Sequence, residues 1–311
     1  MSTESKYLFG PVPSRRLGLS LGVDVVPLKT CTQNCIYCQL GRHGVQTLER
    51  KSYVAAQAVL AELKQRIAEG LRADYITFSG SGEPTLNRDI GAMIDGIRAM
   101  TDMKVAIITN GTLLGDPEVR ADCCKADVVL PSLDAADPET FEKINRPHEA
   151  IRFDAFIEGL CRFREQYAGP IWLEVFLLEG VNTADDEIAR MRELIARIRP
   201  DKVQLNTAVR PTAERNLAAL DEARLQAIAG KLNFNAEVIA DFARPPESQE
   251  MPEASRQILE MLRRRPCSLE DVCRGLGVGG IVAIKNINSL IAAGRVRTQV
   301  QDGKTFYIVP A

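Results

Sequence analysis

The chain has 311 residues, of which 45% are hydrophobic and 26% charged, and its formal net charge is −2. This composition is ordinary for a soluble globular protein, no apolar run approaches the roughly 18 residues of a membrane-spanning helix, and the first residues lack a signal-peptide core. Eight cysteines are too few for a disulfide scaffold in a chain of this length, so we expect a cytoplasmic protein with no membrane partner.

From the first predicted strand, at residues 21–27, strand and helix patterns alternate along the chain. Further short, β-branched strand patterns lie at residues 73–80, 104–112, 126–135, 171–180 and 202–209. Helical periodicity occupies residues 55–71, 88–100, 138–145, 153–167 and 183–198, with a short helix after Pro117. This order predicts an α/β fold with a parallel sheet, a partial (β/α)6 TIM-like barrel, with its chemistry on the loops that follow the strands.

The last part of the chain has a different pattern. Residues 243–253 are rich in Pro and Glu and read as a linker. Amphipathic helices follow at residues 253–265, 268–277 and 280–294, and then a hairpin at residues 295–300 and 304–309. We therefore expect a core at residues 1–245, a linker at 246–253 and a winged helix-turn-helix at 254–311.

A cysteine loop follows the first predicted strand. Cys31, Cys35 and Cys38 form a C-x3-C-x2-C pattern, and thiolates are the usual ligands of iron–sulfur clusters. Three ligands on four irons leave one iron open for chemistry. The alternative is a structural zinc ion held by the same cysteines and His43. The remaining cysteines are expected to be buried or incidental: Cys123, Cys124, Cys161, Cys267 and Cys273.

The sequence CTQNCIYC resembles the signature of the radical S-adenosylmethionine superfamily. The resemblance implies one [4Fe–4S] cluster and S-adenosylmethionine as cofactors, and reductive cleavage of that molecule to a 5′-deoxyadenosyl radical. Residues 79–85, SGSGEPT, resemble the family's Gly-Gly-Glu motif, in which the carboxylate accepts from the substrate ammonium, although Ser81 separates the glycines. The implied cofactor-binding residues are Tyr37, Gly80, Gly82, Glu83, Asn110, Ser132 and Asp134. Taken singly, these turns could be plain structural turns, and their shared position after consecutive strands favours a site.

The stretch from Tyr7 to about Pro211 resembles the branch of wyosine-type tRNA-modifying enzymes and related iron–sulfur oxidoreductases. Those tRNA enzymes have a second cluster whose cysteines lie upstream of the signature. Residues 1–30 contain no cysteine here, so we expect a single cluster and an open choice of substrate: RNA, a peptide or a small molecule. The resemblance also implies an electron donor such as flavodoxin or ferredoxin.

Charged side chains outside the motifs leave several alternatives open. Arg15, Arg16, Arg146 and Arg210 suit phosphate or carboxylate binding, or are solvated surface residues. His148 is a candidate proton-transfer group or a surface histidine, Lys29 would balance thiolate charge, and Asn206 ends the sixth strand.

The ends of the chain are basic, with seven Lys and Arg against three Asp and Glu in residues 1–51 and nine against five in residues 252–311. This predicts an anionic partner or ordinary solvated faces. The third helix of the C-terminal module carries only Lys285 as a base, so the module either contacts nucleic acid or serves as a packing or lid element. The alternative to a radical enzyme is a redox- or iron-sensing regulator that binds DNA.

Overall fold

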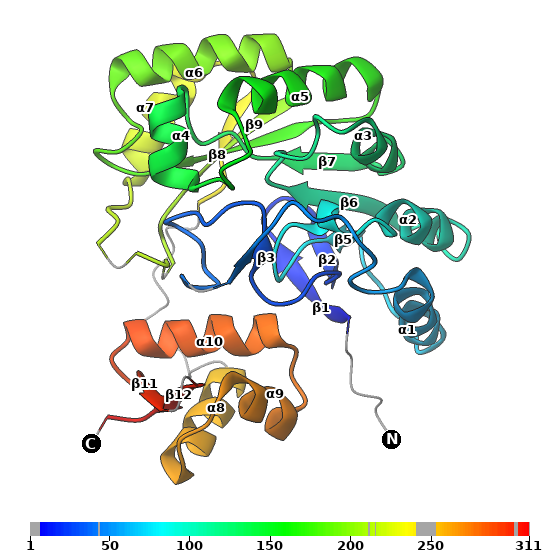
Figure 1. Cartoon of the computed structure of the whole chain (residues 1–311), viewed down its shortest axis with the longest axis vertical. Coiled ribbons are helices and arrows are strands. Elements are labelled where there is room, and N and C mark those ends of the chain that lie inside the picture. Colours follow the sequence, from blue (N-terminus) through cyan, green and yellow to red (C-terminus); the bar gives the residue numbers. More distant parts are fainter. Residues whose placement is uncertain are drawn as a thin grey trace.

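The computed structural model describes residues 7–42, 44–210, 212–214, 216–240, 253–301 and 304–310. Its larger unit is a curved parallel sheet with helices on its outer face (Figure 1). The six parallel strands of the described part that match the prediction are β2 (Gly18–Val23), β5 (Tyr75–Phe78), β6 (Lys104–Thr109), β7 (Val128–Pro131), β8 (Trp172–Leu177) and β9 (Lys202–Thr207). Backbone bridges from Val129 to Ile171 and from Ser132 to Glu174 join β7 to β8 and make the sheet continuous. The predicted α/β partial barrel is confirmed.

The helices of the barrel pack their apolar stripes against the outside of the sheet. They are α1 (Ala56–Ala68), α2 (Ile90–Arg98), α3 (Pro117–Cys123), α4 (Pro138–Asn145), α5 (Phe153–Gln166), α6 (Asp185–Ile198) and α7 (Glu222–Leu232). Asp116, Asp137 and Asp221 cap the first turns of α3, α4 and α7. The large shared core fixes the strand ends, and the loops that carry the predicted site lie at those ends.

Two strands extend the sheet beyond the prediction. β1 (Leu8–Ser14) pairs antiparallel with β2, and β10 (Ala236–Val238) pairs with β9. Pro11 and Pro13 lie within β1, and proline is tolerated in a strand only at an edge of the sheet. Two short strands, β3 (Thr30–Cys31) and β4 (Val45–Gln46), bracket the cysteine loop, and a 3₁₀ turn, η1, covers Pro84–Leu86.

The C-terminal module contains α8 (Glu253–Arg264), α9 (Leu269–Leu276), α10 (Gly280–Ala292) and a hairpin of β11 (Arg297–Gln301) and β12 (Lys304–Ile308). These elements occur in the predicted order and build a hydrophobic cluster separate from that of the barrel. The predicted linker lies outside the described residues except for Glu253, with which α8 begins, so the domain boundary stays a prediction.

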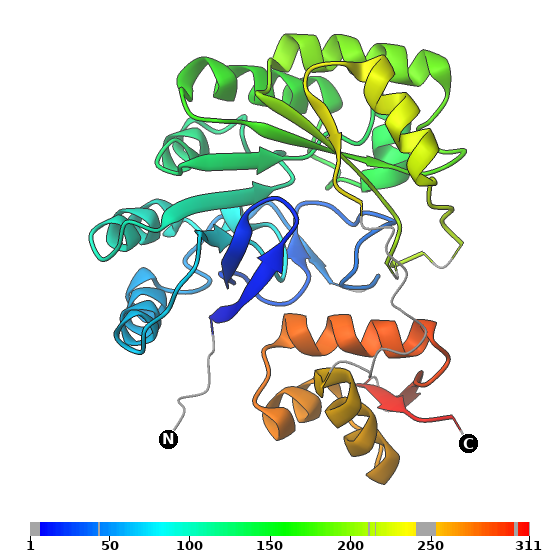
Figure 2. The same ribbon diagram turned by 180° about the vertical axis from the view of Figure 1, so that it is seen from behind.

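The helix of the module that lies nearest the barrel is α10, as both views of the molecule show (Figures 1 and 2). The Asn288 amide donates to the Gln39 carbonyl at 2.7 Å, and Leu28 and Leu40 of the barrel pack against the hydrophobic cluster of the module. The third helix of the predicted winged helix is therefore turned toward the cysteine loop. In the described part of the chain no single helix could span a membrane; α9 and α10 meet the length and composition test only as a pair bent by 115°.

Candidate functional site

The three cysteines of the loop lie together at the carboxyl end of the barrel. Cys31 ends β3, and Cys35 and Cys38 follow in a turn closed by a backbone hydrogen bond of 3.1 Å from Cys38 N to Cys35 O. All three thiols are free and half-buried. The loop is held from above by α4, because Ile36 N donates to Ile144 O at 2.9 Å. Local backbone contacts thus orient three sulfur atoms into one region.

Two asparagine amides, one from the turn after β6 and one from the last residue of α4, contact two of the sulfur atoms. Asn110 Nδ2 lies 3.5 Å from Cys31 Sγ, and Asn145 Nδ2 lies 3.6 Å from Cys35 Sγ. Asn145 Oδ1 is buried and has no hydrogen-bond partner in the described part of the chain, which is unusual for a buried polar atom. Asn110 is one of the implied cofactor-binding residues, and that role stays a prediction; the sequence analysis did not identify Asn145.

Burial disfavours the thiolate form of two cysteines in the loop. Burial, followed by the Glu83 charge, raises the pKa of Cys31 to about 12, and burial also raises the pKa of Cys35 well above its usual range. Such thiols stay protonated unless a metal replaces the proton. Among the described residues no three His, Cys, Asp or Glu side chains are close enough to hold a single metal ion, and this includes the three cysteines. His43, the fourth ligand of the zinc alternative, lies outside the described residues.

The turn after β5 packs directly on the cysteine loop. Gly82 forms a parallel bridge with Thr30, and a Cβ atom on Gly82 would lie 1.8 Å from the Thr30 oxygen, so only glycine fits. Gly80 has a φ of +135° and lies next to Asp24 and to Ile281 of α10. Gly82 therefore permits a close approach of the SGSGEPT turn to the backbone at Thr30, whereas an approach of these glycines to a ligand stays a prediction.

Glu83 is buried between the turns that follow β5 and β6. Its Oε1 accepts from Thr85 N, Thr85 Oγ1 and Thr109 Oγ1 at 3.1, 2.6 and 2.6 Å. Among the described residues its Oε2 accepts from Asn110 N alone, at 2.7 Å. A carboxylate oxygen has room for about two donors, so Oε2 retains capacity for one more. Burial raises the pKa of Glu83, and the hydrogen bonds from Thr109 and Thr85 oppose that effect.

Tyr37 links the cysteine loop to the end of β7. Its ring stacks on Phe176 with the centroids 4.0 Å apart, and its hydroxyl donates to Asp134 Oδ2. Asp134 also accepts from Asn145 Nδ2 at 2.7 Å and from Phe176 N at 2.9 Å. Burial raises the pKa of Asp134 to about 6, against the effect of these donors. Ser132 is half-buried two residues earlier, on the same strand end.

These positions fall within one recognised sequence family. The family model described as the radical SAM superfamily matches residues 25–195, more than half of the chain and the whole stretch from the cysteine loop to α6. The chain belongs to the radical SAM superfamily. It is therefore an enzyme of the class that the cysteine pattern predicted.

Relatives by sequence extend the match beyond this segment. A Methanocaldococcus jannaschii protein named UPF0026 protein MJ1312 is 31% identical over 309 residues, 96% of this chain and 95% of that protein. A Brachyspira hyodysenteriae protein named GTPase Obg is 37% identical over 98% of this chain, which spans only 45% of that protein. Probable GTP 3′,8-cyclase from Methanothermobacter marburgensis is 33% identical over 54% of this chain and 51% of its own length.

Solved structures agree with the radical SAM fold. A radical SAM methyltransferase from Sphaerobacter thermophilus has a TM-score of 0.57 at 17% identity, covering 72% of this chain and 67% of that chain. Streptococcus suis SuiB bound to S-adenosylmethionine has a TM-score of 0.54 at 16% identity, covering 74% and 53%. At these identities the likeness shows the fold alone.

Two of the predicted arginines near the radical SAM site have partners inside the barrel. Arg15 donates to the Ile239 carbonyl, and Arg16 forms an ion pair with Glu174 inside the barrel. Asn206 donates to the same Glu174 carboxylate at 3.0 Å, so this carboxylate binds both Arg16 and Asn206.

Two further predicted residues have structural partners. Arg146 ends α4 in a left-handed conformation and lies 2.9 Å from Glu214. His148 donates its backbone N–H to Thr32 O at 2.8 Å and accepts from Ala150 N, which is a turn contact. Lys29 is buried two residues before Cys31, as charge balance would require.

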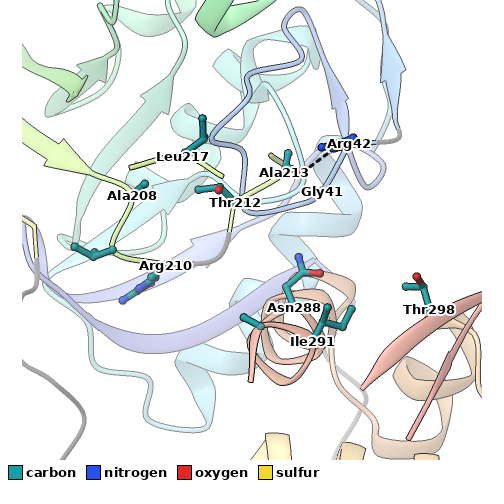
Figure 3. Close-up of a pocket in the computed structure, with 12 residues that line it drawn as sticks. Gly41, Arg42, Ala208, Arg210, Thr212, Ala213, Leu217, Asn288, Ile291 and Thr298 are labelled. Carbon is teal, nitrogen blue, oxygen red and sulfur yellow. Dashed lines mark hydrogen bonds between the residues drawn. The ribbon is translucent and has the colours of Figure 1, made fainter. Parts of the chain in front are cut away.

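A cleft of about 1010 Å³ lies between part of the barrel and part of the C-terminal module (Figure 3). Figure 3 shows Arg42, Arg210 and Leu217 on the barrel side and Asn288 and Ile291 on α10. A smaller pocket of about 150 Å³ shares Arg210 and Asn288 with it and is also lined by Gln39 and Lys285. The space beside the cysteine loop therefore has one wall from each unit of the chain.

Proposed function

We propose that Cys31, Cys35 and Cys38 bind three irons of one [4Fe–4S] cluster, whose open iron binds S-adenosylmethionine. The observation that carries this proposal is the set of three free thiols on one loop, two of them contacted by the side-chain amides of Asn110 and Asn145. A single zinc ion with sulfur ligands at about 2.3 Å needs its ligands side by side. Cluster ligands instead bind different irons, and the C-x3-C-x2-C spacing matches the radical SAM signature.

When bound, the reduced cluster supplies one electron to S-adenosylmethionine, and the C5′–S bond breaks to give methionine and a 5′-deoxyadenosyl radical. The residues of the chain hold the reactants. Asn110 and Asn145 donate to the sulfur ligands, and such bonds tune iron–sulfur centres. Glu83 Oε2 offers its unused acceptor site to the ammonium of S-adenosylmethionine, with the Gly80 and Gly82 backbone beside it.

The end of β7 completes the cofactor site in this proposal. The stack on Phe176 and the hydrogen bond to Asp134 fix the orientation of the Tyr37 side chain before the cofactor binds. Ser132 is half-buried beside this group and supplies a hydroxyl. A small electron-transfer protein of the flavodoxin or ferredoxin class would supply the electron.

RNA is the proposed substrate class, and the sequence resemblance to wyosine-type enzymes is its main support. The unpaired Arg210 in a cleft of about 1010 Å³ agrees with a substrate that carries phosphate. The sensor alternative is less well supported, because a DNA-reading helix must enter the major groove and α10 faces the barrel.

The test is anaerobic reconstitution of the full chain with iron and sulfide, followed by dithionite and S-adenosylmethionine. We expect the absorbance of a [4Fe–4S] cluster and formation of 5′-deoxyadenosine. Cys35→Ala should lose both the cluster and cleavage, whereas Cys161→Ala, a half-buried cysteine of α5, should retain both. An intact cluster without 5′-deoxyadenosine, or a Cys35→Ala protein that still cleaves, would refute the proposal.

A further inference from the structure

Two basic side chains from distant parts of the sequence line one small pocket beside the cysteine loop. Arg210 follows β9 of the barrel, and Lys285 lies in the middle of α10. Both line the pocket of about 150 Å³, together with the amides Gln39, Asn286 and Asn288. Figure 3 shows Arg210 on the barrel and Asn288 on α10, and both also line the larger cleft.

The two cations lack a direct ion-pair partner among the described residues, although the Asp24 charge acts on Lys285 from a distance. The side chains of Lys285 and Arg210 make no hydrogen bond or ion pair with any residue that the structure describes. The nearby carboxylate, Asp24, already accepts from the backbone and hydroxyl of Ser81. Lys285 is exposed to the solvent of the cleft, yet desolvation by the surrounding walls, followed by repulsion from Arg210, lowers its pKa. Two like charges in one pocket favour an anion between them.

A hydrogen bond between α10 and the barrel holds the two sides of the pocket together. The hydrogen bond of 2.7 Å from Asn288 Nδ2 to Gln39 O fixes α10 to the residue that follows Cys38. Arg presents a rigid fork of donors and Lys a compact point charge, a combination that suits an oxyanion with several terminal oxygens. The cleft of about 1010 Å³ that opens from the pocket gives space for the remainder of a larger molecule.

We propose that Lys285 and Arg210 form a phosphate-binding subsite for the substrate of this enzyme, with α10 supplying one of its two cations. The inference rests on the proposed function, since it names the substrate chemistry of the same site. It assigns the C-terminal module to the active site. The same two cations could instead serve the carboxylate of S-adenosylmethionine, and the experiment separates these sources.

Isothermal titration calorimetry with inorganic phosphate on the reconstituted full chain tests the subsite. We expect saturable binding to the wild type, and a dissociation constant raised about tenfold or more in both Lys285→Met and Arg210→Gln. Arg274→Gln is the matched control, because Arg274 is an exposed cation of the same module that pairs with Glu270 and lies outside the cleft. Thermal unfolding of each variant checks that it is folded. Arg210→Gln provides a second test from the barrel side.

Three results would overturn the inference: no phosphate binding by the wild type, equal binding of acetate and phosphate, or unchanged phosphate affinity in both pocket variants. A rise in the KM for S-adenosylmethionine that matches the loss of phosphate affinity in Lys285→Met would assign the cations to the cofactor and also overturn it. Formation of 5′-deoxyadenosine by the wild type is measured on the same preparation. Its absence would refute the proposed function, whatever the outcome of the phosphate titration.

Discussion

The substitution Gly82→Ala should force the turn after β5 away from the cysteine loop, because the added methyl group has no space between them. A Cβ atom there would lie 1.8 Å from the Thr30 oxygen and 2.7 Å from the Thr30 carbonyl carbon. Cβ atoms in proteins essentially never approach a non-bonded heavy atom closer than 3.0 Å. The backbones at Gly82 and Thr30 must therefore move apart by more than about 1 Å. That movement also breaks the hydrogen bond of 3.0 Å from Glu83 N to Thr30 O.

The cost follows from these two terms. Forced overpacking costs about 1–3 kcal/mol, and the lost backbone hydrogen bond about 1 kcal/mol. We therefore expect Gly82→Ala to lower the free energy of unfolding by about 2–4 kcal/mol, measured by urea titration with circular dichroism. Because Thr30 precedes Cys31, the iron bound after reconstitution should fall as well.

A second glycine provides the matched control. Gly230 lies in α7, and no atom lies within 4 Å of a Cβ atom added there. Gly230→Ala should raise the free energy of unfolding by about 0.5–1 kcal/mol, the ordinary helix preference for alanine. If Gly82→Ala unfolds at the same urea concentration as the wild type, the steric argument for the SGSGEPT turn is refuted.

Two further substitutions test the surroundings of the loop. Burial raises the pKa of Asp24 from 3.8 to about 6, so between these values the folded state binds a proton that the unfolded state has lost. The free energy of unfolding should therefore fall as the pH rises from about 4 to above 6. In urea titrations at different pH values, Asp24→Asn should flatten that part of the curve, and an unchanged slope would contradict the pKa shift. Asn145→Leu removes the amide beside Cys35 Sγ, so the reduction potential of the reconstituted centre should become more negative in a spectroscopic redox titration. A potential equal to that of the wild type would show that the contact does not act on the cluster.

The order of the barrel elements could be predicted because each strand is short and β-branched and each helix has one apolar stripe. Residues 104–112 illustrate this, since all of β6 falls within them. β1 was missed because Pro11 and Pro13 interrupt its pattern, and β10 because three residues carry little periodicity. Edge strands depend on a neighbour for their backbone hydrogen bonds, and that neighbour is not visible in the local sequence.

The candidate site was predictable in its thiols and turns but less so in the contacts between them. Spacing identified Cys31, Cys35 and Cys38, whereas the approach of Asn145 to Cys35 depends on how α4 packs over the loop. The direction in which α10 faces was likewise hidden. Its apolar residues predict a helix with a buried side, but they do not reveal that Lys285 and Asn288 meet the barrel on another side.

The attachment of α10 to the same chain as the barrel has a consequence for every assay of this enzyme. The module and the barrel belong to one chain, so the contact between them is intramolecular. Diluting the protein therefore does not weaken this contact. A molecule that binds the face of α10 that contacts the barrel must therefore displace the barrel at every protein concentration. A molecule that fits the existing cleft does not have to do so.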